Sequence, residues 1–450
     1  MKAVLARTVG ALSRRTGRGG TSLPGKLLLR MEPRAIARLA AAIPRGSAAI
    51  SATNGKTTTA AMAASILERD GTRLVSNRTG ANMAGGVATA LLDARGQGDL
   101  GLFEVDEFWL GSVAEQLRPR VLLLANLFRD QLDRYGELET IADRWHEVVA
   151  TAAPRGTRMV LNADDPLVAD LGRDLDDVLY FGVEDRSLAL PGLQHAADSK
   201  HCRRCGAPYV YDAVLLGHLG HYHCPTGDAA RPRPAVAARD VELEGVRAAA
   251  FTLVTDAGER RVRLPLPGLY NVYNALGAAA LAQALGASLD DVVAGLEAVA
   301  PAFGRAETIA LGDRELTLLL IKNPAGANEV LRTLLLEPGE HDVFAVLNDN
   351  IADGRDISWV WDADFELLAG RIRRFTCSGT RAAELAVRLK YAGVGADRIV
   401  VEPDLERGLD RARADGAGRL FALPTYTAML ALRDLLAQRG AARSSWAAPS

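Results

Sequence analysis

The sequence predicts an α/β protein with a central parallel sheet wrapped by helices, an inserted Cys/His-rich segment and a smaller C-terminal α/β domain. Short apolar runs alternate with helical patterns between residues 46 and 302, which is typical of a parallel sheet covered by helices. Polar residues rich in cysteine and histidine interrupt this alternation at 198–236, and it restarts after residue 303.

The domain boundaries are placed where these patterns start and stop. We expect an N-terminal segment over residues 1–45, a central domain over 46–302 that contains the insertion, a C-terminal domain over 303–440 and a tail over 441–450. With 450 residues and 48% hydrophobic composition, the chain is long enough for about two or three domains with sizeable cores.

Individual elements follow from local pattern. Residues 33–42 have a helical pattern, and Ser47–Ser51 is expected to form a short strand that leads into a turn. The apolar run Val121–Ala125 predicts a buried parallel strand. In the C-terminal domain, four apolar runs predict strands at Leu316–Ile321, Val343–Leu347, Ile399–Val401 and Leu420–Leu423.

Composition narrows the classes of function. The net charge is −2 with acidic and basic residues interspersed, so nothing electrostatic favours a nucleic-acid partner or stable binding to an anionic membrane. An uninterrupted apolar run of about 18 residues, as a transmembrane helix needs, is missing from the sequence. The basic residues 1–20 lack the apolar core of a signal peptide, and we expect a cytoplasmic enzyme.

A nucleotide-binding loop is predicted where the first strand meets the next helix. In the segment Ile50–Thr59, a strand is followed by Gly-Lys-Thr-Thr opening a helix. Such a loop offers backbone N–H groups to phosphate, while Lys56 reaches the β- and γ-phosphates and Thr57 reaches Mg²⁺. Ile50 stands where the usual pattern has its first glycine, and an ordinary glycine turn with a capping threonine is the alternative. The expected nucleotide-binding residues are Thr53, Asn54, Gly55, Lys56, Thr57 and Thr58.

Further segments in the same order make the chain resemble the Mur ligase superfamily. They are Thr53–Thr58, Phe103–Glu107, Leu161–Pro166, Pro267–Leu276 and Gly304–Glu307. The resemblance implies a Mur ligase-type central ATPase domain, with Glu104 as a Mg²⁺ carboxylate, Asn271 and Asn274 near the adenine, and Arg305 near the phosphates. In such ligases ATP phosphorylates a substrate carboxylate and an amine attacks the acyl phosphate, so no protein nucleophile is needed.

Three departures from the peptide-adding ligases of this superfamily indicate a subfamily. The segment Asn126–Tyr135 resembles their metal-site signature, but Gln131 stands where they usually have histidine. His146 stands where they often have a carbamylated lysine, so a second catalytic metal is in doubt. The segment Lys322–Gly326 keeps a lysine without the acidic residue that usually precedes it.

Three segments are similar to the MurT family of synthetase subunits, and the resemblance covers about Pro24 to Arg433. They are Asn126–Tyr135, Lys322–Gly326 and Asn348–Trp359. The resemblance implies ATP-dependent amidation of the D-glutamate α-carboxylate in the stem peptide of lipid II, giving D-isoglutamine. Ammonia would come from a GatD-like glutaminase subunit in a heterodimer, and lipid II would require only transient approach to the membrane surface.

A glutaminase needs a Cys/His site, and Cys377 has no convincing partner in this chain. The MurT resemblance implies that an aspartate of the C-terminal domain completes the partner's Cys/His pair. Asp356 is our first choice, with Asp353 and Asp349 as alternatives. A loop of turn-forming aspartates with no catalytic role remains the other interpretation.

The Cys/His-rich insertion predicts a structural zinc ribbon. Cys202 and Cys205 form a Cys-x-x-Cys knuckle, and Cys224 follows about twenty residues later. His221 is our choice for the fourth ligand because His221-x-x-Cys224 repeats the knuckle spacing, which His223 does not. The alternatives are a metal-free ribbon held by tyrosine and leucine packing and, less well supported, a redox dithiol.

Three functions therefore remain open. The first is the amide-forming synthetase subunit of a glutamine-dependent complex. The second is a stand-alone Mur-type or folylpolyglutamate-type ligase that adds an amino acid. The third is a non-catalytic nucleotide-binding scaffold that recruits a partner through its insertion.

Overall fold

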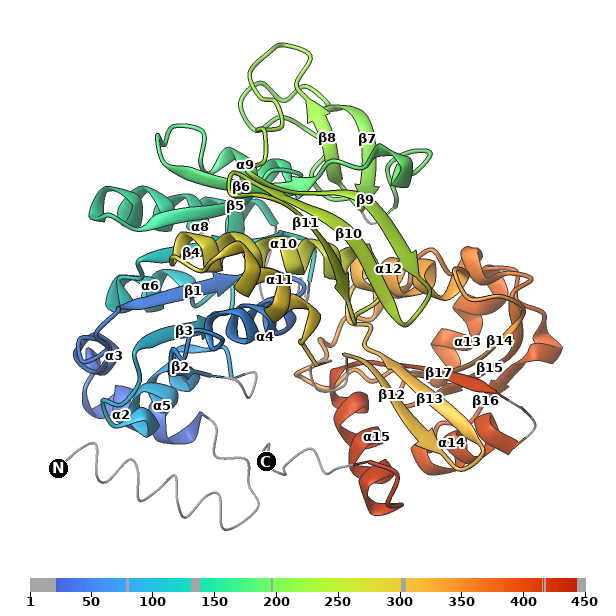
Figure 1. The fold of residues 1–450 in the computed structure, drawn as a ribbon. Coiled ribbons are helices and arrows are strands. Elements are labelled where there is room, and N and C mark those ends of the chain that lie inside the picture. The colour runs from blue at the N-terminus through green and yellow to red at the C-terminus, as the bar shows by residue number, and fades with distance from the viewer. Residues whose placement is uncertain are drawn as a thin grey trace.

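The computed structural model describes residues 22–77, 81–130, 138–195, 197–300, 305–414, 416 and 418–442. Two α/β parts lie side by side (Figure 1), one built around a nine-stranded sheet and the other, in orange and red, around a six-stranded sheet. A separate two-stranded hairpin stands at the top of the view. This arrangement matches the α/β architecture expected from the sequence.

The nine-stranded sheet has the order β11-β10-β9-β6-β5-β4-β1-β3-β2. Strands β1 to β6 and β9 pair in parallel, whereas β10 is antiparallel to both β9 and β11. The expectation of parallel strands up to residue 302 is therefore corrected, because short turns join β9, β10 and β11 and leave no room for crossover helices. The strands are β1 Ser47–Ser51, β2 Leu74–Ser76, β3 Leu100–Glu104, β4 Val121–Leu124, β5 Arg158–Asn162, β6 Val178–Val183, β9 Val236–Glu244, β10 Ala248–Thr255 and β11 Gly258–Leu264.

Helices cover both faces of this sheet. Every residue of β1, β3 and β4 is buried, which explains why these strands are continuous apolar or small-residue runs rather than alternating patterns. One apolar cluster includes side chains of α4, α10 and α11, and a second includes side chains of α5, α6 and α8. The helices are α2 Leu23–Met31, α3 Ala35–Ala40, α4 Lys56–Leu67, α5 Ala84–Ala94, α6 Leu110–Leu117, α8 Leu138–Ala152, α9 Pro166–Asp170, α10 Leu269–Ala284 and α11 Leu289–Glu297.

The insertion between β6 and β9 forms an antiparallel hairpin of β7 (Val210–Leu216) and β8 (Leu219–His223). Its two-residue turn has Gly217 at φ 59°, a left-handed conformation that glycine adopts without strain and that suits a tight hairpin turn. The hairpin forms a sheet of its own and separates β6 from β9 along the chain.

The C-terminal part is built on the sheet β12-β13-β17-β14-β15-β16. The apolar runs expected to form strands fall on β13, β14, β16 and β17, whereas β12 and β15 had no sequence prediction. The strands are β12 Arg305–Leu311, β13 Arg314–Leu319, β14 His341–Val346, β15 Ile372–Ser378, β16 Ile399–Val401 and β17 Arg419–Pro424. The helices are α12 Pro324–Leu335, α13 Ala382–Tyr391, α14 Leu405–Ala414 and α15 Tyr426–Gln438.

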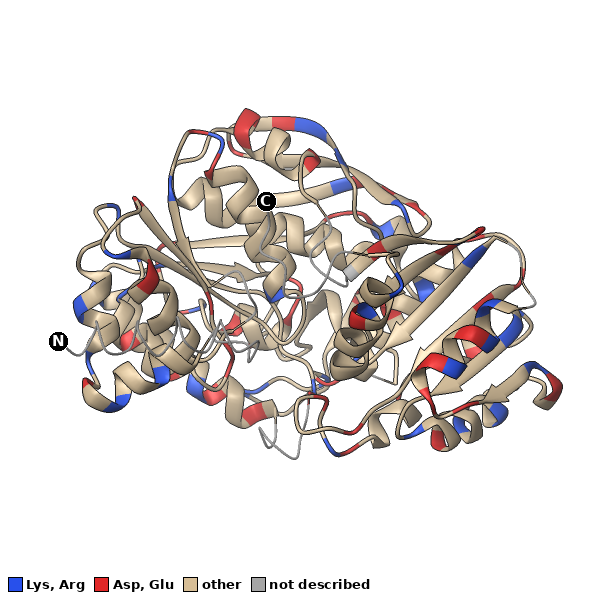
Figure 2. Ribbon diagram, turned by 90° about the horizontal axis from the view of Figure 1, so that it is seen from below, with Lys and Arg blue, Asp and Glu red and all other residues tan. Residues whose placement is uncertain are grey.

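Acidic and basic residues are interspersed over the helices and strands of both parts (Figure 2). This mixed pattern is consistent with the net charge of −2 of the sequence. Within the described ranges, none of the helices has the length and apolar character needed to cross a membrane.

Candidate active site

The predicted phosphate loop lies between β1 and the first turn of α4. Gly55 has φ 86° and directly precedes Lys56, the first residue of the helix. A Cβ atom at Gly55 would lie 2.0 Å from Asn274 Oδ1, so both backbone conformation and space require glycine here. The free N–H groups at the start of α4 make this helix end suitable for phosphate.

Lys56 is buried beside three acidic residues at the end of β3. Its ammonium group donates to Glu107 Oε2 at 2.6 Å and also to the carbonyl oxygen of Ala52. Burial opposes the charged form of Lys56, but the carboxylates of Glu107, Asp106 and Glu104 outweigh it and raise the pKa of Lys56. The pKa of Glu107 is lowered, because Lys56 and Lys322 outweigh its own burial. Lys56 is therefore held as a cation next to the phosphate loop.

Thr57 and Glu104 lie together as the Mg²⁺ prediction requires. Thr57 Oγ1 donates to Glu104 Oε2 at 2.9 Å, and Asn82 Nδ2 donates to Glu104 Oε1 at 3.3 Å. Asn77 fixes the backbone of Glu104 through two hydrogen bonds, of 2.8 and 3.0 Å. A hydroxyl and a carboxylate at the start of a phosphate-binding helix are oxygen ligands of the kind Mg²⁺ prefers.

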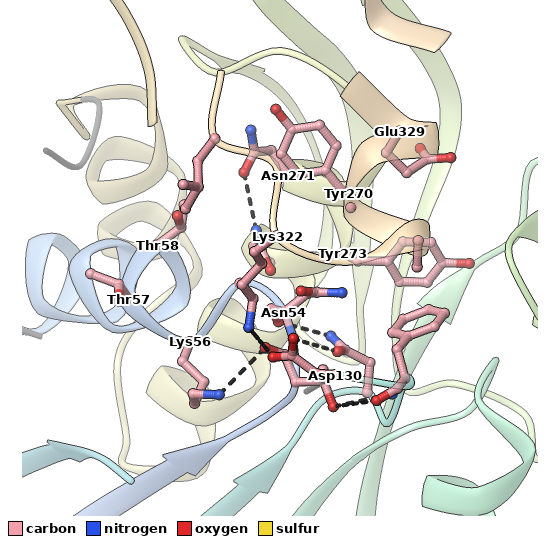
Figure 3. Close-up of a pocket in the computed structure, with 18 of the residues that line it drawn as sticks. Asn54, Lys56, Thr57, Thr58, Asp130, Tyr270, Asn271, Tyr273, Lys322 and Glu329 are labelled. Atoms are coloured by element: carbon pink, nitrogen blue, oxygen red, sulfur yellow. Dashed lines mark hydrogen bonds and ion pairs between the residues drawn. The ribbon is translucent and has the colours of Figure 1, made fainter. Parts of the chain in front are cut away.

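Residues of the C-terminal part also contact the phosphate loop (Figure 3). The side-chain amides of Asn54 and Asn323 exchange hydrogen bonds of 3.3 and 2.9 Å. Lys322 donates to the carbonyl oxygen of Thr53 at 3.1 Å and forms an ion pair with Asp130. Among the described residues, Asp130 Oδ1 is buried without a hydrogen-bond partner, so this oxygen remains available to a ligand.

These residues surround a cavity of about 410 Å³, which is in the size range of small-molecule sites. Its polar lining includes the phosphate loop, Glu104, Asp106, Glu107, Asp130 and Lys322, and its apolar lining includes Phe128, Leu216, Leu219, Leu266, Tyr270 and Tyr273. Both α/β parts contribute to the lining, since Ala352 and Tyr426 belong to the C-terminal part.

Asn271 and Asn274, predicted near the adenine, lie buried in the first turns of α10. Asn274 Nδ2 donates to Asn271 Oδ1 at 3.0 Å, and Asn271 Nδ2 donates to the carbonyl oxygen of Pro267 at 2.7 Å. Both residues line the cavity, and Asn274 also accepts a hydrogen bond of 3.3 Å from Thr59. The structure thus places them beside the phosphate loop.

The three aspartates of the 349–356 loop have different surroundings. Asp349 forms an ion pair of 2.8 Å with Arg381, and the Asp353 carboxylate is buried and accepts from Thr427 N at 2.7 Å at the start of α15. Asp356 is exposed, and its carboxylate accepts from Ser358 N, within its own turn, at 2.8 Å. Asp356 is therefore the most accessible of the three.

Three cysteines come together at the open end of the β7–β8 hairpin. The Sγ atoms of Cys202, Cys205 and Cys224 lie within 4.8 Å of one another. Thr226 Oγ1 lies 2.9 Å from Cys224 Sγ and 3.1 Å from Cys205 Sγ, and its hydrogen bond is the largest cause that lowers the pKa of Cys224 to about 6. A cluster of soft thiolates fits Zn²⁺.

His221 is not brought to this cluster, and the choice of His221 as fourth ligand is corrected. Its Nε2 lies 2.7 Å from the carbonyl oxygen of Val183, and its Nδ1 accepts from Arg186 Nε at 3.2 Å. Successive side chains of a strand point to opposite faces, so His221 faces away from Tyr222 and Cys224, which pack with Cys202. Thr226 and Asp228 offer oxygen atoms beside the cluster and are joined to each other by a hydrogen bond of 2.6 Å.

Parts of the sequence argument lie outside what the structure describes, namely residues 131–135 with Gln131, Gly304, and the side chain of Arg305. His146 is exposed on α8 and does not line the cavity. Sequence reasoning missed Glu107 and Asn323. Glu107 could have been found because it lies in the same acidic segment as Glu104, whereas the contact of Asn323 with Asn54 has no local signal.

Comparison with known proteins agrees with this geometry. Residues 50–209 match the Mur ligase middle domain, and residues 320–429 match the MurT ligase C-terminal family. The pseudomurein peptide ligase type C from Methanothermus fervidus has the same fold, with a TM-score of 0.70 and 24% sequence identity over 88% of this chain and 79% of that one. The fold and the site thus define a Mur ligase-type enzyme.

Some relatives match nearly the whole chain. The subunit MurT of lipid II isoglutaminyl synthase (glutamine-hydrolyzing) from Staphylococcus aureus strain N315 is 32% identical over 96% of both chains. The subunit of the same name from Streptococcus pneumoniae is 34% identical over 94% of both chains. The chain belongs to the MurT family.

Proposed function

We propose that the protein is the synthetase subunit of a glutamine-dependent amidating ligase. It converts the D-glutamate α-carboxylate of the lipid II stem peptide to the D-isoglutamine amide with ATP and ammonia. Its similarity to MurT subunits along nearly the whole chain supports this reaction most directly. The requirement for ATP and the use of a precursor of the cell wall favour a cytoplasmic location.

The residues of the cavity suit the transfer of a phosphoryl group to a carboxylate. The start of α4 and Lys56 bind the ATP phosphates, and Thr57 with Glu104 would hold Mg²⁺. When bound, Mg²⁺ neutralises negative charge on the phosphates. Lys322 extends from the C-terminal part toward the same end of the cavity, where it helps to hold the developing charge. The γ-phosphoryl group passes from ATP to the substrate carboxylate, and ADP is the leaving group. Ammonia then attacks the acyl carbon, the bond from this carbon to the phosphate oxygen breaks, and the phosphate leaves with a proton from the nitrogen.

The ammonia is supplied by a glutaminase partner in a heterodimer, and Asp356 completes the partner's Cys/His pair. This assignment is favoured because the Asp356 carboxylate is exposed and contacts only its own turn among the described residues. Asp349 is less suitable because its carboxylate is already paired with Arg381. Asp353 is less suitable because its buried carboxylate already accepts from Thr427 N at the start of α15.

Ammonia dependence tests the proposed reaction. The purified chain is incubated with ATP, Mg²⁺ and a lipid-linked or soluble stem peptide, first with ammonium and then with glutamine. We expect amidation with ammonium alone, and amidation with glutamine only after a glutaminase partner is added. Addition of an amino acid without any amidation would show instead a stand-alone ligase.

The cysteine cluster supports a structural Zn²⁺ site with an oxygen ligand. Cys202, Cys205 and Cys224 supply three thiolates. Asp228, whose carboxylate accepts from Thr226 Oγ1 at 2.6 Å beside Cys205, is the proposed fourth ligand after a movement of its side chain toward the three sulfurs. Metal analysis and the absorption spectrum of the Co²⁺-substituted protein test this assignment. Asp228→Asn is expected to change the spectrum, and an unchanged spectrum contradicts the role of Asp228.

A further inference from the structure

The two ends of the β7–β8 hairpin have different surroundings. Its open end carries the cysteine cluster, whereas its turn end reaches the cavity that contains the phosphate loop. Leu216 and Leu219 pair across the hairpin next to the turn, and both line the cavity. They are 5% and 2% exposed, so they form part of a closed wall.

The hairpin turn is packed against the segment that follows β4. A Cβ atom at Gly217 would lie 2.8 Å from the ring of Phe128, and the rings of Phe128 and His218 have centroids 4.6 Å apart. Phe128 N in turn donates to Thr53 Oγ1, in the phosphate loop, at 3.1 Å. The turn is therefore connected to the phosphate loop through Phe128, whose ring contacts the turn and whose backbone N–H contacts Thr53.

Hydrogen bonds keep the turn in place. Gly217 N donates to Gln194 Oε1 at 2.7 Å, and the carbonyl oxygen of His218 accepts from Tyr211 OH at 2.8 Å. The fully buried His218 ring accepts from Asp198 N at 3.3 Å, and its other nitrogen lies 3.5 Å from Asp165 Oδ2. A turn with this many fixed contacts is a rigid wall rather than a mobile loop.

The hairpin also contacts the C-terminal part. Arg332 of α12 donates to the carbonyl oxygen of Leu215 at 3.0 Å and forms an ion pair of 2.8 Å with Glu329. Glu329 and Val330 line the same cavity. The hairpin turn therefore lies where the two α/β parts and the cavity meet.

The cavity is lined both by charged groups and by apolar and aromatic side chains. Figure 3 shows Lys56 and Thr57 on one side and Tyr273 and Glu329 on the other. Leu216, Leu219, Leu266 and Tyr270 line the cavity, as does Asn271, whose side chain is an amide. Apolar and aromatic surfaces with one amide suit a flat heteroaromatic base rather than a phosphate.

We propose that the hairpin turn of the insertion supplies the wall against which the nucleotide base packs. Leu216 and Leu219 then contact the base, so the cysteine-bearing insertion contributes directly to nucleotide binding. This inference rests on the proposed function, because it assumes that the phosphate loop binds ATP.

Binding of two ligands to the full-length chain tests the wall. ADP carries the base, whereas inorganic tripolyphosphate carries only the charge. Each ligand is titrated into the protein in the presence of Mg²⁺, and its affinity is measured by calorimetry. For Leu216→Ala and Leu219→Ala we expect ADP affinity to fall by about tenfold or more, with tripolyphosphate affinity nearly unchanged. Val210→Ala, at an exposed position of β7, is the control and should change neither.

The more conservative Leu216→Met and Leu219→Met keep the core volume and serve if the alanine variants do not fold. They are expected to lower the ratio of ADP to tripolyphosphate affinity by a smaller factor. An unchanged ratio in every folded variant, or an equal loss for both ligands, overturns the proposed wall. A wild-type chain that binds neither ligand would instead count against the proposed function.

Discussion

At the residue scale, the site is organised by charges that are buried together. Lys56 is stabilised as a cation by Glu107 and its acidic neighbours, and Glu104 is positioned by Asn77 and Asn82. In a site with little water, fixed charges of this kind stabilise the transferring phosphoryl group more strongly than they would in solvent. Individual side chains here are therefore expected to have large effects on rate.

Replacing Lys56 with alanine removes the cation beside the phosphate loop. We expect ATP turnover in the presence of stem peptide and ammonium to fall by about 100-fold or more, because one fixed charge on the transferring group is lost. Phosphate release measures the effect, and Lys390→Ala, at an exposed position of α13, is the control. Undiminished turnover in Lys56→Ala would contradict a role in phosphate binding.

Asp356→Asn keeps the size of the side chain and removes its charge. We expect glutamine-driven amidation by the complex to fall by about 100-fold or more, while the ammonium-driven reaction stays at the wild-type rate. Amide formation from each nitrogen source is the measurement. Asp349→Asn is the comparison, because its carboxylate already pairs with Arg381 and should be dispensable for glutamine use. Selective loss in Asp349→Asn would transfer the role to that residue.

At the element scale, the β7–β8 hairpin connects two features that are separate in the sequence. Strand alternation puts Tyr222 and Cys224 on the face that packs with Cys202 and turns His221 toward Val183. The tight turn at Gly217 brings Leu216 and Leu219 to the cavity. The insertion thus places its cysteines at the open end of the hairpin and the apolar side chains of Leu216 and Leu219 at the turn end.

Cys202→Ser tests the structural role of the cluster. We expect the purified variant to contain much less zinc and to have a lower midpoint of thermal unfolding, because a structural Zn²⁺ site contributes directly to folding free energy. Metal analysis and thermal denaturation measure the two effects. His223→Ala is the control, since this histidine is partly exposed and lies near Asp212. Equal zinc content in wild type and Cys202→Ser would argue for a metal-free cluster.

At the scale of the whole molecule, the two α/β parts meet over the phosphate loop. Asn323 caps α12 through a hydrogen bond from Gly326 N at 2.9 Å and also pairs with Asn54. Lys322 bridges Asp130 and the carbonyl oxygen of Thr53. A ligase site made by both parts depends on their closure, which excludes water from the acyl phosphate.

Lys322→Met keeps much of the side-chain length and removes the charge that joins the two parts. We expect the rate of amidation at saturating ATP and ammonium to fall by about tenfold or more, because the Asp130 carboxylate loses its ion pair and the loop loses a bridging donor. Lys390→Met is the matched control on the surface of the C-terminal part. A wild-type rate in Lys322→Met would mean that this bridge has no catalytic role.

The sequence by itself determined the α/β class, the phosphate loop, the Glu104 segment and the subfamily. The phosphate loop and the Glu104 segment depend on residues that are close together in the chain, such as a strand followed by Gly-Lys-Thr-Thr, whereas the class and the subfamily depend on the order of several such segments. Apolar runs also predicted most strands of the C-terminal sheet, because buried parallel strands are continuous apolar segments. That pattern did not distinguish the antiparallel pairs β9–β10 and β10–β11 from parallel pairs.

Only the tertiary structure decided how distant segments meet. Asn54 and Asn323 are 269 residues apart in the sequence, so their paired amides have no local signal. The direction of His221, the exposure of Asp356 and the place of Leu216 and Leu219 in the cavity wall depend equally on what packs around them. Local periodicity specifies which face of an element is apolar, but the partner of that face is fixed only when the elements pack.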